Sequence, residues 1–120
     1  VMVRQYRKPV EEFLLEIPAG GMDPGESPES AAQRELQEET GYVAEELVQL
    51  SSFWTTPGFC TELMHAYLAR GLRPAALTPD EDENIEVVRV PLSGAADLIR
   101  RGEIKDAKSI ASLLLVLDLS

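Results

Sequence analysis

The segment from Gly20 to Tyr42, GGMDPGESPESAAQRELQEETGY, constrains the fold of this chain more than any other segment. Ser27 is a good N-cap residue and Pro28 suits the first turn of a helix. Gly41 suits the left-handed conformation that ends many helices, and most residues between these signals favour helix. The segment therefore predicts a helix over about 28–40, preceded by a loop rich in glycine and proline.

Three glutamates follow one another at i, i+3 and i+4 in this helix: Glu35, Glu38 and Glu39. This spacing places them within one turn on one face. Their repulsion, and their position at the negative end of the helix dipole, each cost on the order of 0.3–1 kcal/mol. A divalent cation such as Mg²⁺ or Mn²⁺ would reverse both penalties. The alternative is a solvated acidic face, laced by the i, i+4 pair of Arg34 and Glu38.

The loop before the helix favours the metal site over the solvated face. Its sequence, PAGGMDPGE at 18–26, has three glycines and two prolines. Such a composition is typical of a shaped turn rather than of a flexible tether. A shaped turn can bring a backbone carbonyl close to the helix, where it would add an oxygen ligand for the cation.

The same segment resembles the signature of the Nudix hydrolases, G-x5-E-x7-R-E-U-x-E-E-x-G-U, in which U is a bulky aliphatic residue. One position departs from it, because Tyr42 occupies the last U. The resemblance implies hydrolysis of a diphosphate linked to another group, with Mg²⁺ or Mn²⁺ as cofactor. It also implies an α/β fold, the Nudix α/β/α sandwich with a mixed β-sheet between helices. The matching positions are Gly20, Glu26, Arg34, Glu35, Leu36, Glu38, Glu39 and Gly41.

Further segments resemble one subgroup of that family, the ADP-ribose pyrophosphatases. These are VRQYR at 3–7, LEIPAG at 15–20, the acidic run at 80–83, and Pro57, which lies 15 residues after Tyr42. The subgroup implies hydrolysis of ADP-ribose to AMP and ribose 5-phosphate. Two alternatives stay open: a hydrolase of another nucleoside diphosphate sugar, and a non-catalytic Nudix-fold domain that binds a nucleotide for regulation.

The resemblance also implies site residues. Glu35 and Glu39 would bind the metal, with the Ala19 carbonyl and with Glu38 as a further ligand. The general base would come from the acidic loop, at Glu83 or Glu81, with Glu38 as the next candidate; a plain solvated acidic loop is the alternative. Substrate would contact Arg7 and Glu62, although a surface arginine and a solvated loop acid are the plain alternatives for these two. Structural support would come from Gly20, Glu26, Arg34 and Pro57, with Glu26 paired to Arg34.

Composition narrows the possible partners. The net charge of −10 argues against broad binding to nucleic acid. It also means that an anionic substrate, such as the nucleoside diphosphate sugar that the resemblance implies, needs a metal and local arginines to overcome the overall field. No apolar run reaches about 18 residues, so we expect no membrane span. The single cysteine, Cys60, fits a reducing compartment and hence a cytoplasmic location. Cys60 and His65 lie five residues apart, but nothing in the sequence indicates a catalytic dyad.

The length predicts one Nudix domain over 1–120. Proteins that resemble this chain carry additional N-terminal strands, so we expect such strands before Val1, and a homodimer whose active site borrows residues from the partner. Apolar patterning predicts strands over about 1–7, 12–17, 47–54, 63–68 and 85–90. Two more helices are expected, over 93–101 with Ser93 as N-cap and over 106–118. The apolar stripe of the last helix, Ile110, Leu113, Leu114 and Leu117, is expected to face the core.

Overall fold

The computed structural model describes residues 1–76 and 85–119, and within them the strands form two sheets. The first sheet has the order β2-β1-β5, built from Met2–Arg7 (β1), Glu12–Glu16 (β2) and Glu86–Val88 (β5). The second is the long hairpin of Tyr42–Trp54 (β3) and Leu63–Pro74 (β4). All these pairs are antiparallel. The predicted α/β class is therefore confirmed, and the described strands lie in two antiparallel sheets rather than in one mixed sheet.

Helix α1, Pro28–Thr40, has the bounds that the sequence predicted. The Ser27 side chain accepts a hydrogen bond from the Ser30 backbone N–H at 3.1 Å. At the other end Gly41 has a φ of 76° and donates its N–H to the Gln37 carbonyl at 2.9 Å. A left-handed residue at this point stops the helix and starts β3 at once.

The hairpin is longer than the sequence predicted at its open end. β3 begins at Tyr42 rather than near 47, and β4 continues to Pro74 rather than to 68. Ala44 has little strand preference, but the Gln33 side chain on α1 bonds both its N–H and its carbonyl, at 3.1 and 2.8 Å. The helix therefore holds this part of β3 extended by tertiary contacts that local sequence does not show.

The C-terminal part begins with a short 3-10 turn, Leu92–Gly94, followed by α2 (Ala95–Arg100) and α3 (Ala107–Asp118). The N-cap of α2 is Gly94, so the expected cap at Ser93 was wrong, because the 3-10 turn shifts the helix start. Asp106 caps α3 by accepting the Ser109 N–H at 3.1 Å.

The hydrophobic core lies between α3 and the first sheet. It is built on Met2, Leu15 and Ile104, with partly buried Ile110 and Leu113 packed against them. Leu114 is 50% exposed, so its expected place in the core was wrong. The buried polar residues of α3 are instead Ser109 and Ser112, and the Ser109 hydroxyl accepts the Ile17 N–H at 2.9 Å.

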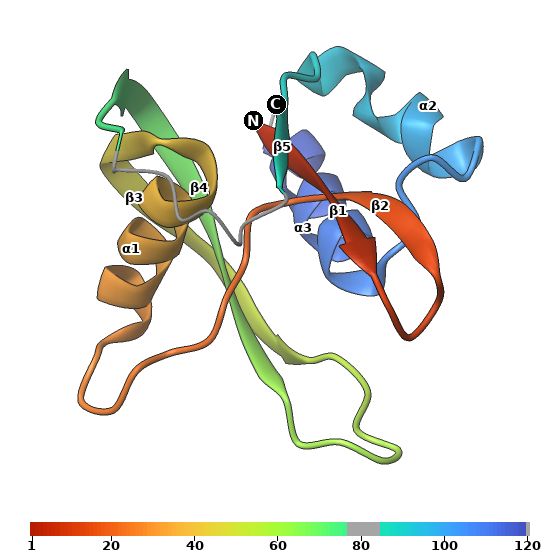
Figure 1. Ribbon diagram of the computed structural model, residues 1–120, viewed down its shortest axis with the longest axis horizontal. Coiled ribbons are helices and arrows are strands. Elements are labelled where there is room, and N and C mark those ends of the chain that lie inside the picture. The colour runs from red at the N-terminus through yellow and green to blue at the C-terminus, as the bar shows by residue number, and fades with distance from the viewer. Residues whose placement is uncertain (77–84, 120) are drawn as a thin grey trace.

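Helix α1 lies on one side of the hairpin, and α2 and α3 lie beside the first sheet (Figure 1). The far end of the hairpin, where β3 is joined to β4, extends away from α1 and from the first sheet (Figure 1). Of the helices described, none is long and apolar enough to cross a membrane.

Candidate active site

Arg34 lies at the centre of a cluster of carboxylates on α1 and the loop before it. Its Nε and Nη2 donate to the two oxygens of Glu26 at 2.8 and 3.0 Å. Its Nη1 donates to Glu35 at 2.8 Å and to Glu38 at 3.2 Å. One guanidinium thus joins the loop to the helix and offsets part of the repulsion between two helix glutamates.

The loop is fixed to α1 mainly through Glu26. This carboxylate also accepts the Asp23 N–H at 2.9 Å, and Arg34 donates to the Gly21 carbonyl at 2.8 Å. The hydrogen bonds from Arg34, followed by the one from the Asp23 backbone, lower the pKa of Glu26 to about 2. The same pairing raises the pKa of Arg34. The ion pair that we expected between Glu26 and Arg34 is therefore present, and it stays charged at neutral pH.

Glu35 and Glu39 meet the loop at two adjacent residues, Ala19 and Gly20. The Ala19 N–H donates to Glu39 Oε2 at 3.1 Å. A Cβ on Gly20 would lie 2.0 Å from Cδ of Glu35, so only glycine leaves room for that carboxylate. The loop backbone and these two side chains therefore converge at one place, next to the Arg34 cluster.

The donors at this place suit a hard divalent cation. Mg²⁺ commonly binds through a few carboxylates and completes its coordination with water and substrate phosphate, and Glu35, Glu39 and the Ala19 carbonyl match that set. Arg34 contacts one oxygen each of Glu35 and Glu38. Among residues 1–76 and 85–119, no group of three or more His, Cys, Asp or Glu side chains is already arranged as a metal site. The two acids expected from the loop at 77–84, Glu81 and Glu83, lie outside the described residues.

Arg7 lies at the end of β1 and is bound to a residue that the sequence interpretation left out. Its Nε and Nη2 donate to Glu16 at 2.8 and 3.0 Å, and Lys108 of α3 also donates to Glu16. Glu16 is only 2% exposed. A carboxylate inside the apolar run LLEIP was the signal for a paired buried charge, because such a group is tolerated only with partners.

Pro57 and Glu62 lie in the loop that joins β3 to β4. The Thr55 hydroxyl donates to Glu62 at 2.9 Å, and the Thr55 N–H donates to the Glu62 carbonyl at 3.1 Å. This loop forms the far end of the hairpin, which extends away from α1 (Figure 1). Within one copy of the chain, the structure therefore does not bring Glu62 together with the glutamates of α1.

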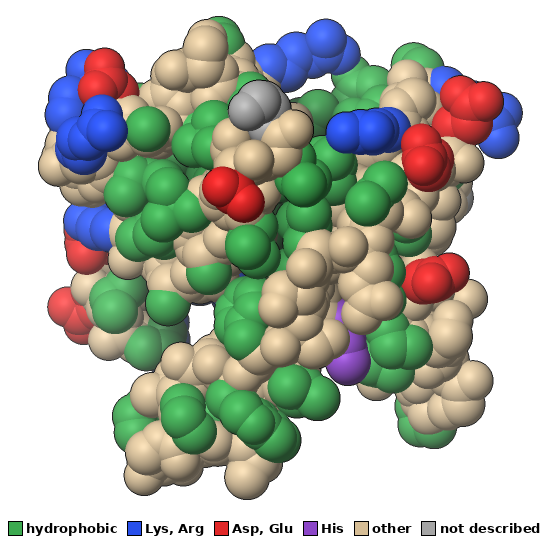
Figure 2. Space-filling model, turned by 180° about the vertical axis from the view of Figure 1, so that it is seen from behind, with side chains coloured by type: hydrophobic (Ala, Val, Ile, Leu, Met, Phe, Trp, Pro, Cys, Tyr) green, Lys and Arg blue, Asp and Glu red, His purple; other side chains and the backbone are tan. Residues whose placement is uncertain are grey.

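The far end of the hairpin is also rich in exposed apolar side chains. Trp54, Phe59 and Leu63 are 55%, 85% and 44% exposed. Figure 2, which views the molecule from behind, shows apolar side chains gathered on this projection. Cys60 and His65 each have another partner: His65 Nδ1 lies 2.7 Å from the Ser52 hydroxyl, and Cys60 Sγ accepts the Glu62 N–H at 3.4 Å.

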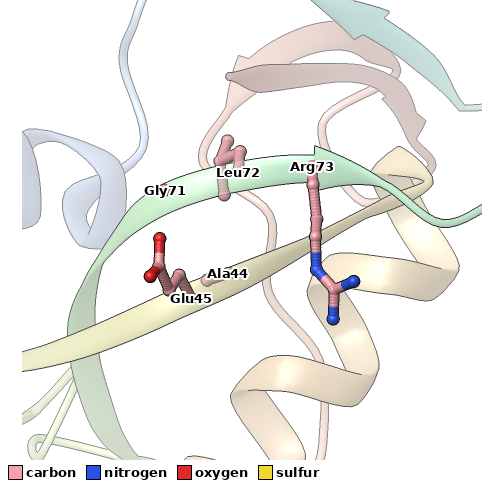
Figure 3. Close-up of a pocket in the computed structure, with 5 residues that line it drawn as sticks. All are labelled: Ala44, Glu45, Gly71, Leu72 and Arg73. Atoms are coloured by element: carbon pink, nitrogen blue, oxygen red, sulfur yellow. The ribbon is translucent and has the colours of Figure 1, made fainter.

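A shallow pocket lies at the open end of the hairpin, lined by Ala44, Glu45, Gly71, Leu72 and Arg73 (Figure 3). Gly71 has a φ of 68°, and a Cβ there would lie 2.7 Å from Cβ of Glu45. None of the expected site residues lines this pocket, so it is separate from the carboxylate cluster on α1.

Comparison with known proteins identifies the class. The model of the NUDIX domain matches residues 1–113, and the chain belongs to the Nudix family. A solved structure described as an ADP compounds hydrolase superposes with a TM-score of 0.89 at 34% identity, covering 98% of this chain and 64% of that one. This match confirms the Nudix fold.

Two curated relatives are similar over most of the chain. The ADP-ribose pyrophosphatase of Bacillus subtilis is 46% identical over 111 residues, which cover 91% of this chain and 60% of that protein. The methanol dehydrogenase activator of Bacillus methanolicus is 44% identical over 115 residues, 94% of this chain and 62% of that protein. The chain thus spans about 60% of the length of these relatives.

Proposed function

We propose that this protein hydrolyses the diphosphate of ADP-ribose to AMP and ribose 5-phosphate with Mg²⁺, or Mn²⁺, as cofactor. The observation that carries the proposal is the convergence of Glu35 and Glu39 on the backbone of Ala19 and Gly20. The names of two similar proteins, an ADP-ribose pyrophosphatase and an ADP compounds hydrolase, support the substrate.

The proposed roles follow from the chemistry of the side chains. Glu35, Glu39 and the Ala19 carbonyl would hold the metal, with Glu38 able to join them by turning from Arg34. A metal at this position would neutralise the diphosphate and stabilise charge that develops on the leaving oxygen. Arg34 and Glu26 keep the loop against α1, and Gly20 leaves room for Glu35. Arg7 would contact the diphosphate.

The attacking water needs a base that can reach it when substrate is bound. We propose Glu83 or Glu81 for this role, with Glu38 as the next candidate, since a positioned carboxylate can take a proton from water. A cation held by Glu35 and Glu39 would attract such a carboxylate toward the water once substrate is present.

Glu62 and Pro57 fit the proposal if two copies of the chain assemble. The far end of the hairpin carries Glu62 away from its own α1 and exposes Trp54 and Phe59. Exposed aromatic side chains of this kind are frequent at interfaces. We therefore propose a homodimer in which Glu62 binds substrate at the site of the partner. A cytoplasmic location is part of the proposal, supported by the single Cys60.

The regulatory alternative has one observation in its favour, the similarity to a protein named methanol dehydrogenase activator. A binding domain without turnover has no need of a tightly spaced row of glutamates, which repel one another. Product analysis separates the two. We expect equimolar AMP and ribose 5-phosphate from ADP-ribose with Mg²⁺, and none after chelation with EDTA; nucleotide binding without any product would support the alternative.

A further inference from the structure

Glu16 is the most buried charged side chain in the part of the chain that the structure describes. It is 2% exposed and ends β2, three residues before Ala19. Arg7 donates to both of its oxygens and Lys108 to Oε1. Burial alone would raise the pKa of Glu16, but the hydrogen bonds from Arg7 and Lys108 outweigh it and lower the pKa. Glu16 is therefore a carboxylate held ionised inside the protein by two cations.

The pair with Glu16 uses only one edge of the Arg7 guanidinium. Nε and Nη2 face Glu16, whereas Nη1 takes no part in the pair. The Arg7 side chain remains 41% exposed. A guanidinium can bind planar or tetrahedral anions through two nitrogens at once, and its second edge is suited to a phosphate. Arg7 is thus fixed on one edge and accessible elsewhere.

The strand register shows that Arg7 does not project straight from the sheet. Arg7 lies opposite Glu12, while Glu16 lies opposite Val3 at the other end of the ladder. To reach Glu16, the Arg7 side chain must therefore lie along the sheet, in the direction in which β2 runs from Glu12 to Glu16. It then extends toward the segment that leads to Ala19. The pKa of Arg7 is raised chiefly by its hydrogen bonds to Glu16 and in smaller part by the charge of Glu39. The strand that carries Arg7, β1, is in contact with α1, the helix that carries the carboxylate cluster.

Lys108 extends this pair to α3. It also donates to Asp106 Oδ2 at 2.9 Å, and Asp106 caps the helix. The side chains of Lys108 and Asp106 are 14% and 16% exposed, so the charges are shielded from water. Glu16 thus links β1, through Arg7, to α3, through Lys108.

We propose that Glu16 is a positioning residue for substrate binding: it holds Arg7 in the orientation that contacts the diphosphate. The proposal rests on the proposed function, in which Arg7 meets that group. A fixed guanidinium loses less freedom when the anion binds than a solvated one would, so Glu16 increases affinity without touching substrate. Removing the Glu16 carboxylate should therefore weaken substrate binding, and it should do so only when Arg7 is present.

The test is a double-mutant cycle of Glu16→Gln and Arg7→Gln. Steady-state kinetics with ADP-ribose give KM and kcat, calorimetry gives the Kd for inorganic diphosphate, and thermal unfolding gives Tm. We expect Glu16→Gln to raise KM and Kd about tenfold while kcat stays within about threefold, as for loss of a positioning contact. In the Arg7→Gln background, the same change should alter KM and Kd by less than about twofold, because its effect requires Arg7.

Glu16→Asp covers the case in which Glu16→Gln does not fold, since it keeps the charge and shortens the reach by one methylene. It should raise KM severalfold when Arg7 is present and leave KM unchanged in the Arg7→Gln background. Glu12→Gln is the matched control: Glu12 lies on the same strand and pairs with Lys105, just before α3, at 2.5 Å. That pair is about half exposed, so KM, Kd and Tm should change little.

A purely structural Glu16 gives a different pattern. The folded Glu16 variants would then lower Tm with KM and Kd within about twofold of wild type, or would change them equally with and without Arg7. Either result overturns the proposal, and so does a wild-type protein that does not bind diphosphate. A wild-type protein that binds diphosphate but does not hydrolyse ADP-ribose refutes the proposed function alone, because the binding cycle still tests Glu16.

Discussion

Ala19 donates its backbone N–H to the Glu39 carboxylate at 3.1 Å, which joins the loop before α1 to the last turn of that helix. Glu35, one turn earlier, lies against the neighbouring Gly20. Like charges on one helix face repel, and the loop backbone and Arg34 offset part of that repulsion here. The proposed metal site rests on this convergence.

The first prediction concerns Glu39. Glu39→Gln keeps the size of the side chain and an oxygen that can accept the Ala19 N–H, but it removes one charge from the proposed metal site. We expect activity to fall by at least about two orders of magnitude while the fold survives. Activity assays at saturating Mg²⁺ and circular dichroism measure both. Glu29→Gln, an exposed acid in the first turn of the same helix, is the control; near-normal activity of Glu39→Gln would remove Glu39 from the metal site.

The second prediction compares two adjacent glycines. A Cβ on Gly20 would lie 2.0 Å from Glu35 Cδ, whereas a Cβ on Gly21 would meet nothing within 4 Å. Gly20→Ala must therefore displace the Glu35 carboxylate. We expect kcat to fall about tenfold or more, and the Mg²⁺ concentration that gives half-maximal activity to rise. Gly21→Ala should behave like wild type. Equal activity of the two variants would show that the position of Glu35 does not matter for turnover.

The third prediction concerns the pH dependence of stability. The pKa of Glu26 is lowered from 4.5 to about 2 by Arg34, so the folded state favours the ionised form. The contribution of this pair is present above pH 4.5 and is lost as the pH falls toward about 2. Thermal unfolding of wild type and Glu26→Gln should differ above pH 4.5 and converge toward pH 2. Parallel curves over the whole range would mean that the pair does not stabilise the loop.

The fourth prediction concerns the acidic loop. If Glu83 or Glu81 takes the proton from water, Glu83→Gln or Glu81→Gln lowers kcat far more than it raises KM, the pattern of a group that acts in the transition state. Kinetics with ADP-ribose at saturating Mg²⁺ measure both constants. Should both variants keep kcat within about threefold, a difference under about 1 kcal/mol, the base lies elsewhere and Glu38 becomes the next candidate.

The fifth prediction concerns assembly. In a homodimer that shares residues, Glu62 of one copy and Glu39 of the other serve the same site. Mixing Glu62→Gln with Glu39→Gln after partial unfolding and refolding should then restore activity, because every mixed dimer carries one intact site and one site with both substitutions. Light scattering should give twice the mass of one chain. A fully active monomer, or mixtures no more active than either variant alone, would contradict the shared site.

Local sequence signals were enough for the elements whose ends carry their own caps. Ser27, Pro28 and Gly41 define α1 without help from the rest of the chain, and the fixed spacing of its glutamates places them on one face. The contact of Glu26 with Arg34 also followed from the spacing of the signature that this segment resembles. These features depend on residues close together in sequence.

The features that sequence did not reveal depend on distant residues. The start of β3 is held by Gln33, and the partners of Glu16 come from β1 and from α3. Leu114 matched the apolar period of its helix, yet the helix turns Ser112 inward instead. Periodicity shows which residues share a face, but the packing of other elements decides which face is buried.

A screen of nucleoside diphosphate sugars with Mg²⁺, scored by kcat/KM, tests the proposed activity most directly. The panel should include ADP-ribose, ADP-glucose, GDP-mannose and UDP-glucose, with Glu39→Gln as the inactive reference. We expect the highest kcat/KM for ADP-ribose, and loss of that activity in the reference. A higher kcat/KM for another nucleoside diphosphate sugar would show that ADP-ribose is not the preferred substrate. The absence of turnover on every compound would contradict the claim that this carboxylate cluster is an active site.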